Sequence, residues 1–136
     1  GGAMPGETDL DRMLSSLALQ LLPEGYVFCT VPDGVYGAFE MLKPIASVQE
    51  VEGLTLVLQQ AHADQAGLSY DGVFSCIRLG VHSSLHAIGL TAAVSRGLAE
   101  GGVSANMFAG FYHDHVFVPA VHADRAIRLL EGLRVV

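Results

Sequence analysis

The stretch that decides the fold is Gly89-Leu90-Thr91-Ala92-Ala93-Val94-Ser95-Arg96-Gly97-Leu98-Ala99-Glu100-Gly101-Gly102-Val103-Ser104-Ala105-Asn106. Its small and apolar residues predict a helix that runs through a glycine turn into a strand. A strand pattern precedes it at residues 73–79, another follows at 116–119, and a helical pattern over 123–133 closes the chain. The order strand, helix, strand, strand, helix indicates an α+β fold and is typical of ligand-sensing domains.

An internal repeat divides the chain into two halves. Residues 61–66 (AHADQA) return as residues 121–126 (VHADRA), 60 positions later, and a weaker echo links residues 25–31 with 71–77 at a spacing of 46. The difference in spacing means that the first copy is shorter. Where the second copy has its long helix, the first has only residues 32–44, whose glycines and prolines limit any helix to about two turns. We therefore expect only one well-formed ligand loop per chain.

Local patterns predict the remaining elements. A leading helix fits Leu10–Leu22, with Thr8 or Asp9 as its cap and Pro23 as its end. Strands are expected at residues 26–31, 47–51 and 54–59. The last two are predicted to form a tight hairpin through Glu52-Gly53.

Composition excludes several classes of partner. The 136 residues are 51% hydrophobic and 15% charged, with a formal charge of −7 and no basic cluster, so neither nucleic acid nor an anionic membrane surface is expected to bind. No apolar run approaches the roughly 20 residues needed to span a bilayer, and no signal-peptide pattern opens the sequence. Cys29 and Cys76 lie in apolar strand patterns, where reduced thiols pack as small hydrophobes. These features predict a cytoplasmic protein.

Several segments carry a family resemblance. The stretch 89–106 resembles the first helix and second strand of an ACT domain, a small regulatory module with a ferredoxin-like plan. Residues 70–74 and 110–119 resemble the second half of stand-alone bacterial proteins with two ACT-like units, and residues 25–34 and 52–58 resemble the first half. The resemblance implies a ferredoxin-like ACT fold with antiparallel sheets and with helices packed on one face.

The repeat and the resemblance together predict the domain organisation. Residues 1–22 are expected to be an N-terminal remnant, marked by two glycines before Met4, followed by the leading helix. Residues 23–68 are expected to form a first, shortened ACT-like unit. Residues 69–136 are expected to form a second, fuller unit.

The resemblance implies binding and regulation. ACT domains bind amino acids where the loop between the first strand and first helix of one unit faces a strand of its neighbour. Carried onto this chain, the ligand-binding residues are His82, Ser83, Ser84, Leu85, Ile88, Gly89, Leu90, Asn106 and Met107. Backbone amides at a helix start suit a carboxylate, and glycine permits close approach. The family pattern has an acidic or amide residue and a proline before this glycine, whereas His86, Ala87 and Ile88 precede it here, so Gly89 could instead serve close helix–sheet packing.

The expected function is therefore a regulatory protein that senses an amino acid or related metabolite at an ACT–ACT interface, as a homodimer and without a cofactor. The alternatives are an oligomerisation or protein-interaction module without ligand, and a metal-dependent hydrolase that uses the loop with His82 and Ser83. No residue is assigned a catalytic role. His113 and His115 are weak candidates for metal binding, because side chains two apart on a strand share a face. Their expected roles are those of a turn residue and a polar strand residue.

Overall fold

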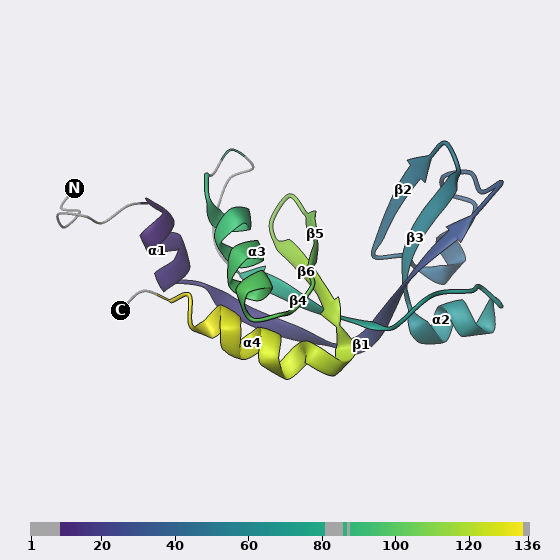
Figure 1. Cartoon of the computed structure of the whole chain (residues 1–136). Coiled ribbons are helices and arrows are strands. Elements are labelled where there is room, and N and C mark those ends of the chain that lie inside the picture. The colour runs from purple at the N-terminus through teal and green to yellow at the C-terminus, as the bar shows by residue number, and fades with distance from the viewer. Residues whose placement is uncertain (1–8, 81–85, 87, 135–136) are drawn as a thin grey trace. The chain divides into compact units, whose positions relative to one another are not determined.

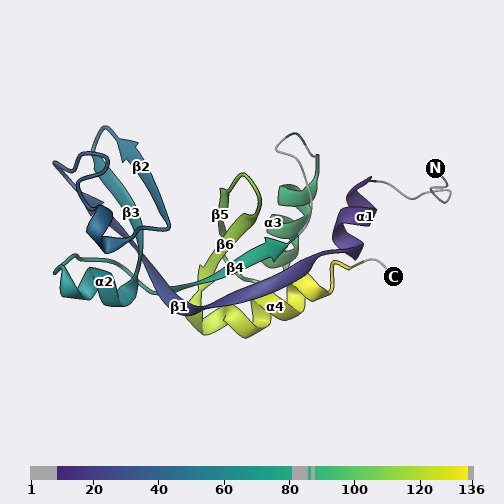
Figure 2. The ribbon, with the colours of Figure 1, turned by 180° about the vertical axis from the view of Figure 1, so that it is seen from behind.

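Two compact units make up the chain in the computed structural model, which describes residues 9–80, 86 and 88–134. The terminal unit combines Gly1–Leu22 with Cys76–Val136, and the central unit is Pro23–Ser75. Figures 1 and 2 show the elements of both units from opposite sides. Each unit is an α+β structure whose strands pair antiparallel, as the sequence predicted.

Two long strands pass from one unit into the other. Strand β1 (Ala18–Val31) begins in the terminal unit and continues into the central unit after Leu22. Strand β4 (Phe74–Gly80) begins in the central unit and continues into the terminal unit after Ser75. In the terminal unit, a Cβ placed on Gly80 would lie 3.3 Å from the Cβ of Ala18, and Nη1 of Arg78 donates to Oε1 of Gln20 at 3.4 Å. These contacts show that β1 and β4 run antiparallel.

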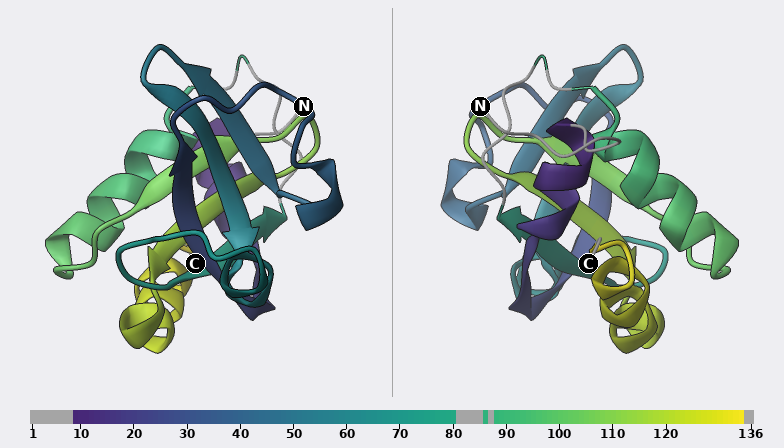
Figure 3. Two further views of the ribbon diagram at one scale, coloured as in Figure 1. Left: turned by 90° about the vertical axis from the view of Figure 1, so that its right-hand side faces the viewer. Right: turned by 90° about the vertical axis from the view of Figure 1, so that its left-hand side faces the viewer.

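The terminal unit has the strand order β1-β4-β6-β5. Helix α1 (Asp9–Ser15) precedes β1, and α3 (Leu90–Glu100) follows β4. Strands β5 (Asn106–Ala109) and β6 (Asp114–Pro119) form a hairpin in which Phe108 pairs with His115, and η2 (Ala120–His122) leads into α4 (Ala123–Glu131). Figure 3 shows α3 and α4 side by side.

The core of the terminal unit lies between the helices and one face of the sheet. Side chains from α1, α3 and α4 pack with alternate residues of β4 and β6, because residues two apart on a strand point to the same face. The fully or nearly fully buried members include Leu14, Ile77, Leu79, Leu90, Val94, Leu98, Val116, Val118, Ala126 and Leu130. The helices therefore cover a single face of these strands, as expected.

The central unit has the strand order β2-β3-β1. Its elements after β1 are the 3₁₀ helix η1 (Glu40–Leu42), β2 (Ala46–Glu50), β3 (Gly53–Gln59) and α2 (Gln60–Gln65). Its core consists of Val27, Cys29, Leu54, Leu56, Leu58 and Ala63, with Phe39 and Leu42 packed against it. In the connection between β1 and β2, the only helical residues are the three of η1, whereas α3 lies at the corresponding place in the terminal unit. The prediction of a shortened first copy is therefore confirmed.

One predicted element is wrong and another is shifted. The leading helix ends at Ser15 instead of Leu22, and residues 18–22 form part of strand β1. Pro23, which was expected to end the helix, therefore lies inside β1. The turn of the β2–β3 hairpin is Val51-Glu52, and Gly53 already pairs with Glu50. Residues 69–75, which the sequence placed in the fuller unit, lie in the central unit.

Candidate functional site

Gly89 opens α3 in a conformation that only glycine adopts easily. Its φ of +101° lies in the left-handed region, and its carbonyl accepts the N–H of Ala93 at 2.9 Å, which starts the helix. A Cβ on Gly89 would lie 3.0 Å from Cδ2 of Leu10. The absence of a side chain at Gly89 therefore serves both the turn and the close approach of Leu10 from α1.

The residues beside Gly89 differ sharply in exposure. Leu90 is 3% exposed and belongs to the core of the terminal unit, whereas Ile88 is 88% exposed. Leu90 therefore contributes packing at this helix start, and Ile88 is the neighbour open to a ligand. The other four predicted residues of this loop, His82, Ser83, Ser84 and Leu85, lie outside the described residues.

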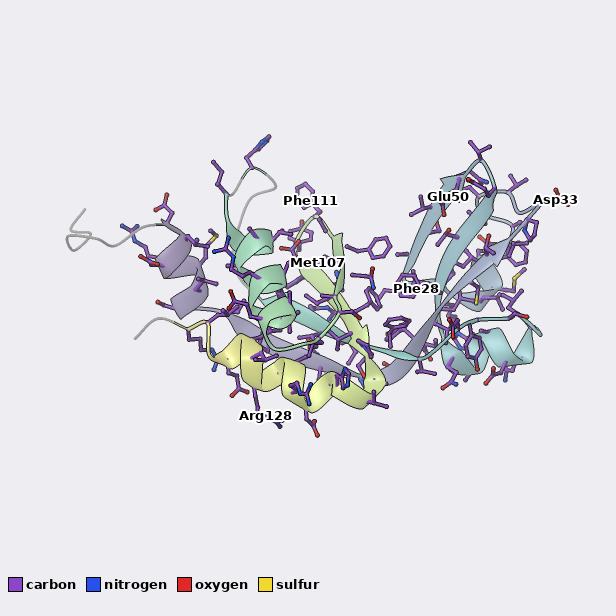
Figure 4. The ribbon with its side chains drawn as sticks, viewed as in Figure 1. Phe28, Asp33, Glu50, Met107, Phe111 and Arg128 are labelled. Atoms are coloured by element: carbon purple, nitrogen blue, oxygen red, sulfur yellow. The ribbon has the colours of Figure 1, made fainter. Side chains whose placement is uncertain are left out.

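The two candidates on β5 lie at the edge of the strand order of the terminal unit. Asn106 is exposed, and Met107 is half-buried. Oγ of Ser95 donates to Sδ of Met107 at 3.6 Å, which connects β5 to α3. Figure 4 labels Met107. Met107 is thus held by the same helix that Gly89 begins, while Asn106 is free to meet solvent or a ligand.

A cavity of about 320 Å³ lies along α3 and includes Gly89. Its lining combines small and apolar residues with one cation and one anion: Leu10, Gly89, Ala92, Ala93, Arg96, Gly97, Glu100 and Leu133. Arg96 and Glu100 are four residues apart, so they lie on the same side of the helix. The cavity can therefore offer a guanidinium and a carboxylate to a small polar ligand. Neither charged residue was among the ligand-binding residues predicted from the sequence, although their spacing of four is typical of neighbours on one helix face.

The histidine candidates lie on and before β6. His113 precedes the strand and its carbonyl accepts the N–H of Gly110 at 2.8 Å, while His115 is half-buried opposite Phe108. Burial, and next the charge of Arg78, lowers the pKa of His115, which favours its neutral form. Across residues 9–80, 86 and 88–134, no three His, Cys, Asp or Glu side chains come close enough to hold a metal ion. The hydrolase alternative depended on His82 and Ser83, which are not described.

Both cysteines are buried and free. Burial raises the pKa of Cys29, and it raises the pKa of Cys76 to about 11. Because the thiolate is the nucleophilic form, neither sulfur is activated for covalent chemistry near neutral pH.

Comparisons with known proteins identify the family. Residues 5–75 match one ACT domain family and residues 73–132 match a second. A Vibrio cholerae protein of unknown function, described as a possible transport protein, is 47% identical; the match covers 93% of this chain and 96% of that one, with a TM-score of 0.84. A protein from Agrobacterium tumefaciens is 19% identical over 87% and 89% of the two chains, with a TM-score of 0.67.

The fold also occurs in a regulatory protein. The ligand-free regulatory subunit of aspartate kinase from Thermus thermophilus is 12% identical over 88% of this chain and 97% of that one, with a TM-score of 0.62. No curated protein matches the sequence. No helix among the described residues is long and apolar enough to cross a membrane. The two family matches span nearly the whole chain and confirm the ferredoxin-like, tandem arrangement, so this protein belongs to the ACT domain family.

Proposed function

We propose that this protein is a regulatory protein that senses an amino acid or related metabolite at the start of α3, and that it performs no catalysis. The observation that carries the proposal is the cavity beside Gly89, where Arg96 and Glu100 accompany an apolar lining. A zwitterion needs one cationic and one anionic partner, and the two side chains supply them. Membership of the ACT family supports the same role.

The proposed site extends from Ile88 and Gly89 to Asn106 and Met107, and the loop residues His82, Ser83, Ser84 and Leu85 are proposed to complete it. Pairing of ACT units at this edge, as a homodimer, would place a second wall against the exposed Asn106. The buried, unpaired thiols of Cys29 and Cys76 support a reducing, cytoplasmic setting.

A thermal-shift panel of the twenty amino acids tests the proposal. A ligand at about a hundred times its dissociation constant adds about 2.7 kcal/mol to the free energy of unfolding, which raises the melting temperature by several degrees. We expect one amino acid to give such a shift, and we expect Arg96→Met and Glu100→Gln, which each remove one charge from the cavity, to reduce it. Arg125→Met is the matched control, because this exposed α4 side chain does not line the cavity. A flat panel would count against the sensor.

A second candidate function is a ligand-free interaction module that binds another copy of this chain. Phe111 and Tyr112 favour it, because they are 79% and 78% exposed between β5 and β6, with ring centroids 5.0 Å apart (Figure 4). Exposed aromatic pairs are typical anchors of protein interfaces. Light scattering of the Phe111→Ser, Tyr112→Ser double variant tests this candidate, which predicts a fall from dimer to monomer mass.

A further inference from the structure

The part of β1 that belongs to the terminal unit has a strand partner on one side only. Strand β4 lies beside residues 18–22, whereas β3 pairs with β1 over residues 26–31. In the part of the chain that the structure describes, no strand pairs with the other side of residues 18–22. This segment, which we call the open edge, therefore presents backbone N–H and C=O groups that a further strand can pair with.

The sequence of the open edge does not protect it from pairing. It reads Ala18-Leu19-Gln20-Leu21-Leu22, with no charged residue, and Pro23 follows only at its end. Edge strands of monomeric proteins usually carry a lysine or a proline, because an unprotected edge accepts a strand from another chain. Leu21 is also 43% exposed. The open edge is therefore suited to binding a further strand.

A groove of about 450 Å³, which we call the α4 groove, is lined by the open edge and by α4. Leu19 and Leu21 line it from the strand, and the half-buried Ile127 lines it from the helix. The end of α4 lies beside the start of β1, where Nε of Arg134 donates to the carbonyl of Leu17 at 3.0 Å (Figure 1). The α4 groove thus has an apolar centre that another molecule can cover.

Charges of alternating sign border the α4 groove. Along α4 and the turn after it they are the exposed residues Asp124, Arg128, Glu131 and Arg134, of which Figure 4 labels Arg128. Their spacing of three or four residues places them on one side of the helix. Among the described residues, the side chains of the first three have no ion-pair partner within their own chain. The whole chain has a formal charge of −7, so a face with equal numbers of both signs departs from its average.

This order of charges is complementary to itself. When two copies of α4 lie side by side in opposite directions, Asp124 of one copy faces Arg134 of the other. In the same register Arg128 faces Glu131, because both pairs are centred on the turn around Leu129. A two-fold axis at this turn therefore converts all four charges into contacts between opposite signs.

The open edge fits the same two-fold axis. Ten residues at the helical rise extend about 15 Å, and five strand residues extend about 17 Å, so the row of charges and the open edge have similar lengths. The contact of Arg134 with Leu17 places the two side by side. We propose that two copies of this protein pair antiparallel through their open edges, where Leu21 of each copy is covered by the other and the two α4 helices exchange ion pairs.

This pairing is separate from the contacts proposed above. In the strand order of the terminal unit, β1 and β5 lie at opposite ends, so the open edge is not the edge that carries Asn106. The pairing also needs no ligand. Its test is therefore independent of the amino-acid sensor.

Charge exchange tests the proposal. Arg128→Glu places a like charge opposite Glu131 of the second copy, and Glu131→Arg places a like charge opposite Arg128. By sedimentation velocity we expect a wild-type dimer, and a dissociation constant about tenfold higher for each variant. When the two variants are mixed, opposite charges meet again, and we expect a heterodimer with the wild-type affinity. Native mass spectrometry of the mixture, with one variant labelled with ¹⁵N, identifies this heterodimer.

Two further variants complete the comparison. The double variant Arg128→Glu, Glu131→Arg exchanges both charges and is expected to recover the dimer. Arg125→Glu changes the net charge as much as Arg128→Glu does but lies outside the α4 groove, and it is expected to stay dimeric. A monomeric wild type, single variants that dimerise as well as Arg125→Glu, or a mixture that stays monomeric would overturn the proposal.

The Phe111→Ser, Tyr112→Ser double variant separates this interface from the aromatic one considered above. A dimer mass that persists in this variant, and that is lost when Arg128→Glu is added, supports pairing through the open edge. A monomer mass in the aromatic double variant alone would remove that pairing and leave the aromatic contact as the interface.

Discussion

Nδ1 of His62 lies 2.9 Å from the carbonyl oxygen of Leu42 and donates its proton to it. Because a carbonyl can only accept, the ring proton of His62 is assigned to Nδ1. The contact joins α2 to the last residue of η1, and so holds the short connection between β1 and β2 in place. His122, the counterpart of His62 in the sequence repeat, has a buried Nδ1 with no hydrogen-bond partner.

Replacing His62 is expected to destabilise the protein more than replacing His122. His62→Ala loses a hydrogen bond and leaves the carbonyl of Leu42 unpaired, which costs about 1–2 kcal/mol. His122→Ala also loses packing contacts, but it removes a buried nitrogen that destabilises the folded state because it has no hydrogen-bond partner. The loss of packing is thus partly offset. Urea unfolding of the two variants measures the difference. Equal losses would show that the bond between His62 and Leu42 contributes nothing.

Gly53→Ala is expected to be among the most damaging small changes in the central unit. The added Cβ would lie 2.7 Å from the carbonyl oxygen of Val31 and 2.9 Å from Cα of Pro32, and the φ of Gly53 is +154°. Because both neighbours are backbone atoms, neither can turn away, and we expect a loss of about 2–4 kcal/mol.

Gly67→Ala is the control for this clash. Gly67 has a φ of +69°, but a Cβ there would meet nothing within 4 Å. Its cost is expected to be only the left-handed backbone penalty of about 1–2 kcal/mol. Denaturant unfolding that gave the two glycine variants the same stability would contradict the steric argument.

Cys76 is expected to make stability fall at alkaline pH. Burial raises the pKa of its thiol from 9.0 to about 11 in the folded protein, so the unfolded chain loses this proton first. Between these two values the unfolded state binds fewer protons, and the free energy of unfolding decreases as pH rises. Cys76→Val should flatten the fall between pH 9 and 11, measured by urea unfolding at several pH values. An unchanged slope would contradict the assignment.

Lys43→Gly is expected to leave the fold intact or make it more stable. The φ of Lys43 is +52°, in the left-handed region. Glycine relieves a left-handed penalty of about 1–2 kcal/mol, while its freedom in the unfolded chain offsets about 0.5–1 kcal/mol of that gain. Lys43→Ala keeps the strain and should show no gain. Differential scanning calorimetry of both variants measures the effect. A substantial loss of stability in Lys43→Gly would mean that the lysine side chain holds the fold together.

Much of the fold could be predicted because its strongest signals are local. The periodic apolar residues of α3 and the repeat around His62 and His122 gave the order of elements without any tertiary information. Residues 18–22 were predicted as helix because leucine-rich sequence without clear alternation fits a helix as well as a strand. They become strand because β4 lies beside them, a pairing between residues almost 60 positions apart that no local window contains.

The candidate site residues could likewise be predicted where the sequence signal is local, and not where it depends on contacts made in the folded protein. Gly89 could be predicted because a glycine before a helix is a local signal. The approach of Leu10 to Gly89 could not, because α1 and α3 meet only in the folded unit. The left-handed backbone of Lys43 could not be predicted either, since it is a property of the folded connection and not of the residue type.

The passage of β1 through both units sets an order for folding during synthesis. The central unit is complete once Ser75 has left the ribosome, and its residues 23–75 form one continuous segment. Residues 18–22 emerge earlier, but their partner strand and the helices of their own unit are encoded after residue 75, so they must wait unpaired until the rest of the chain follows. The unit that holds the first residues of the chain is thus the last one to be finished.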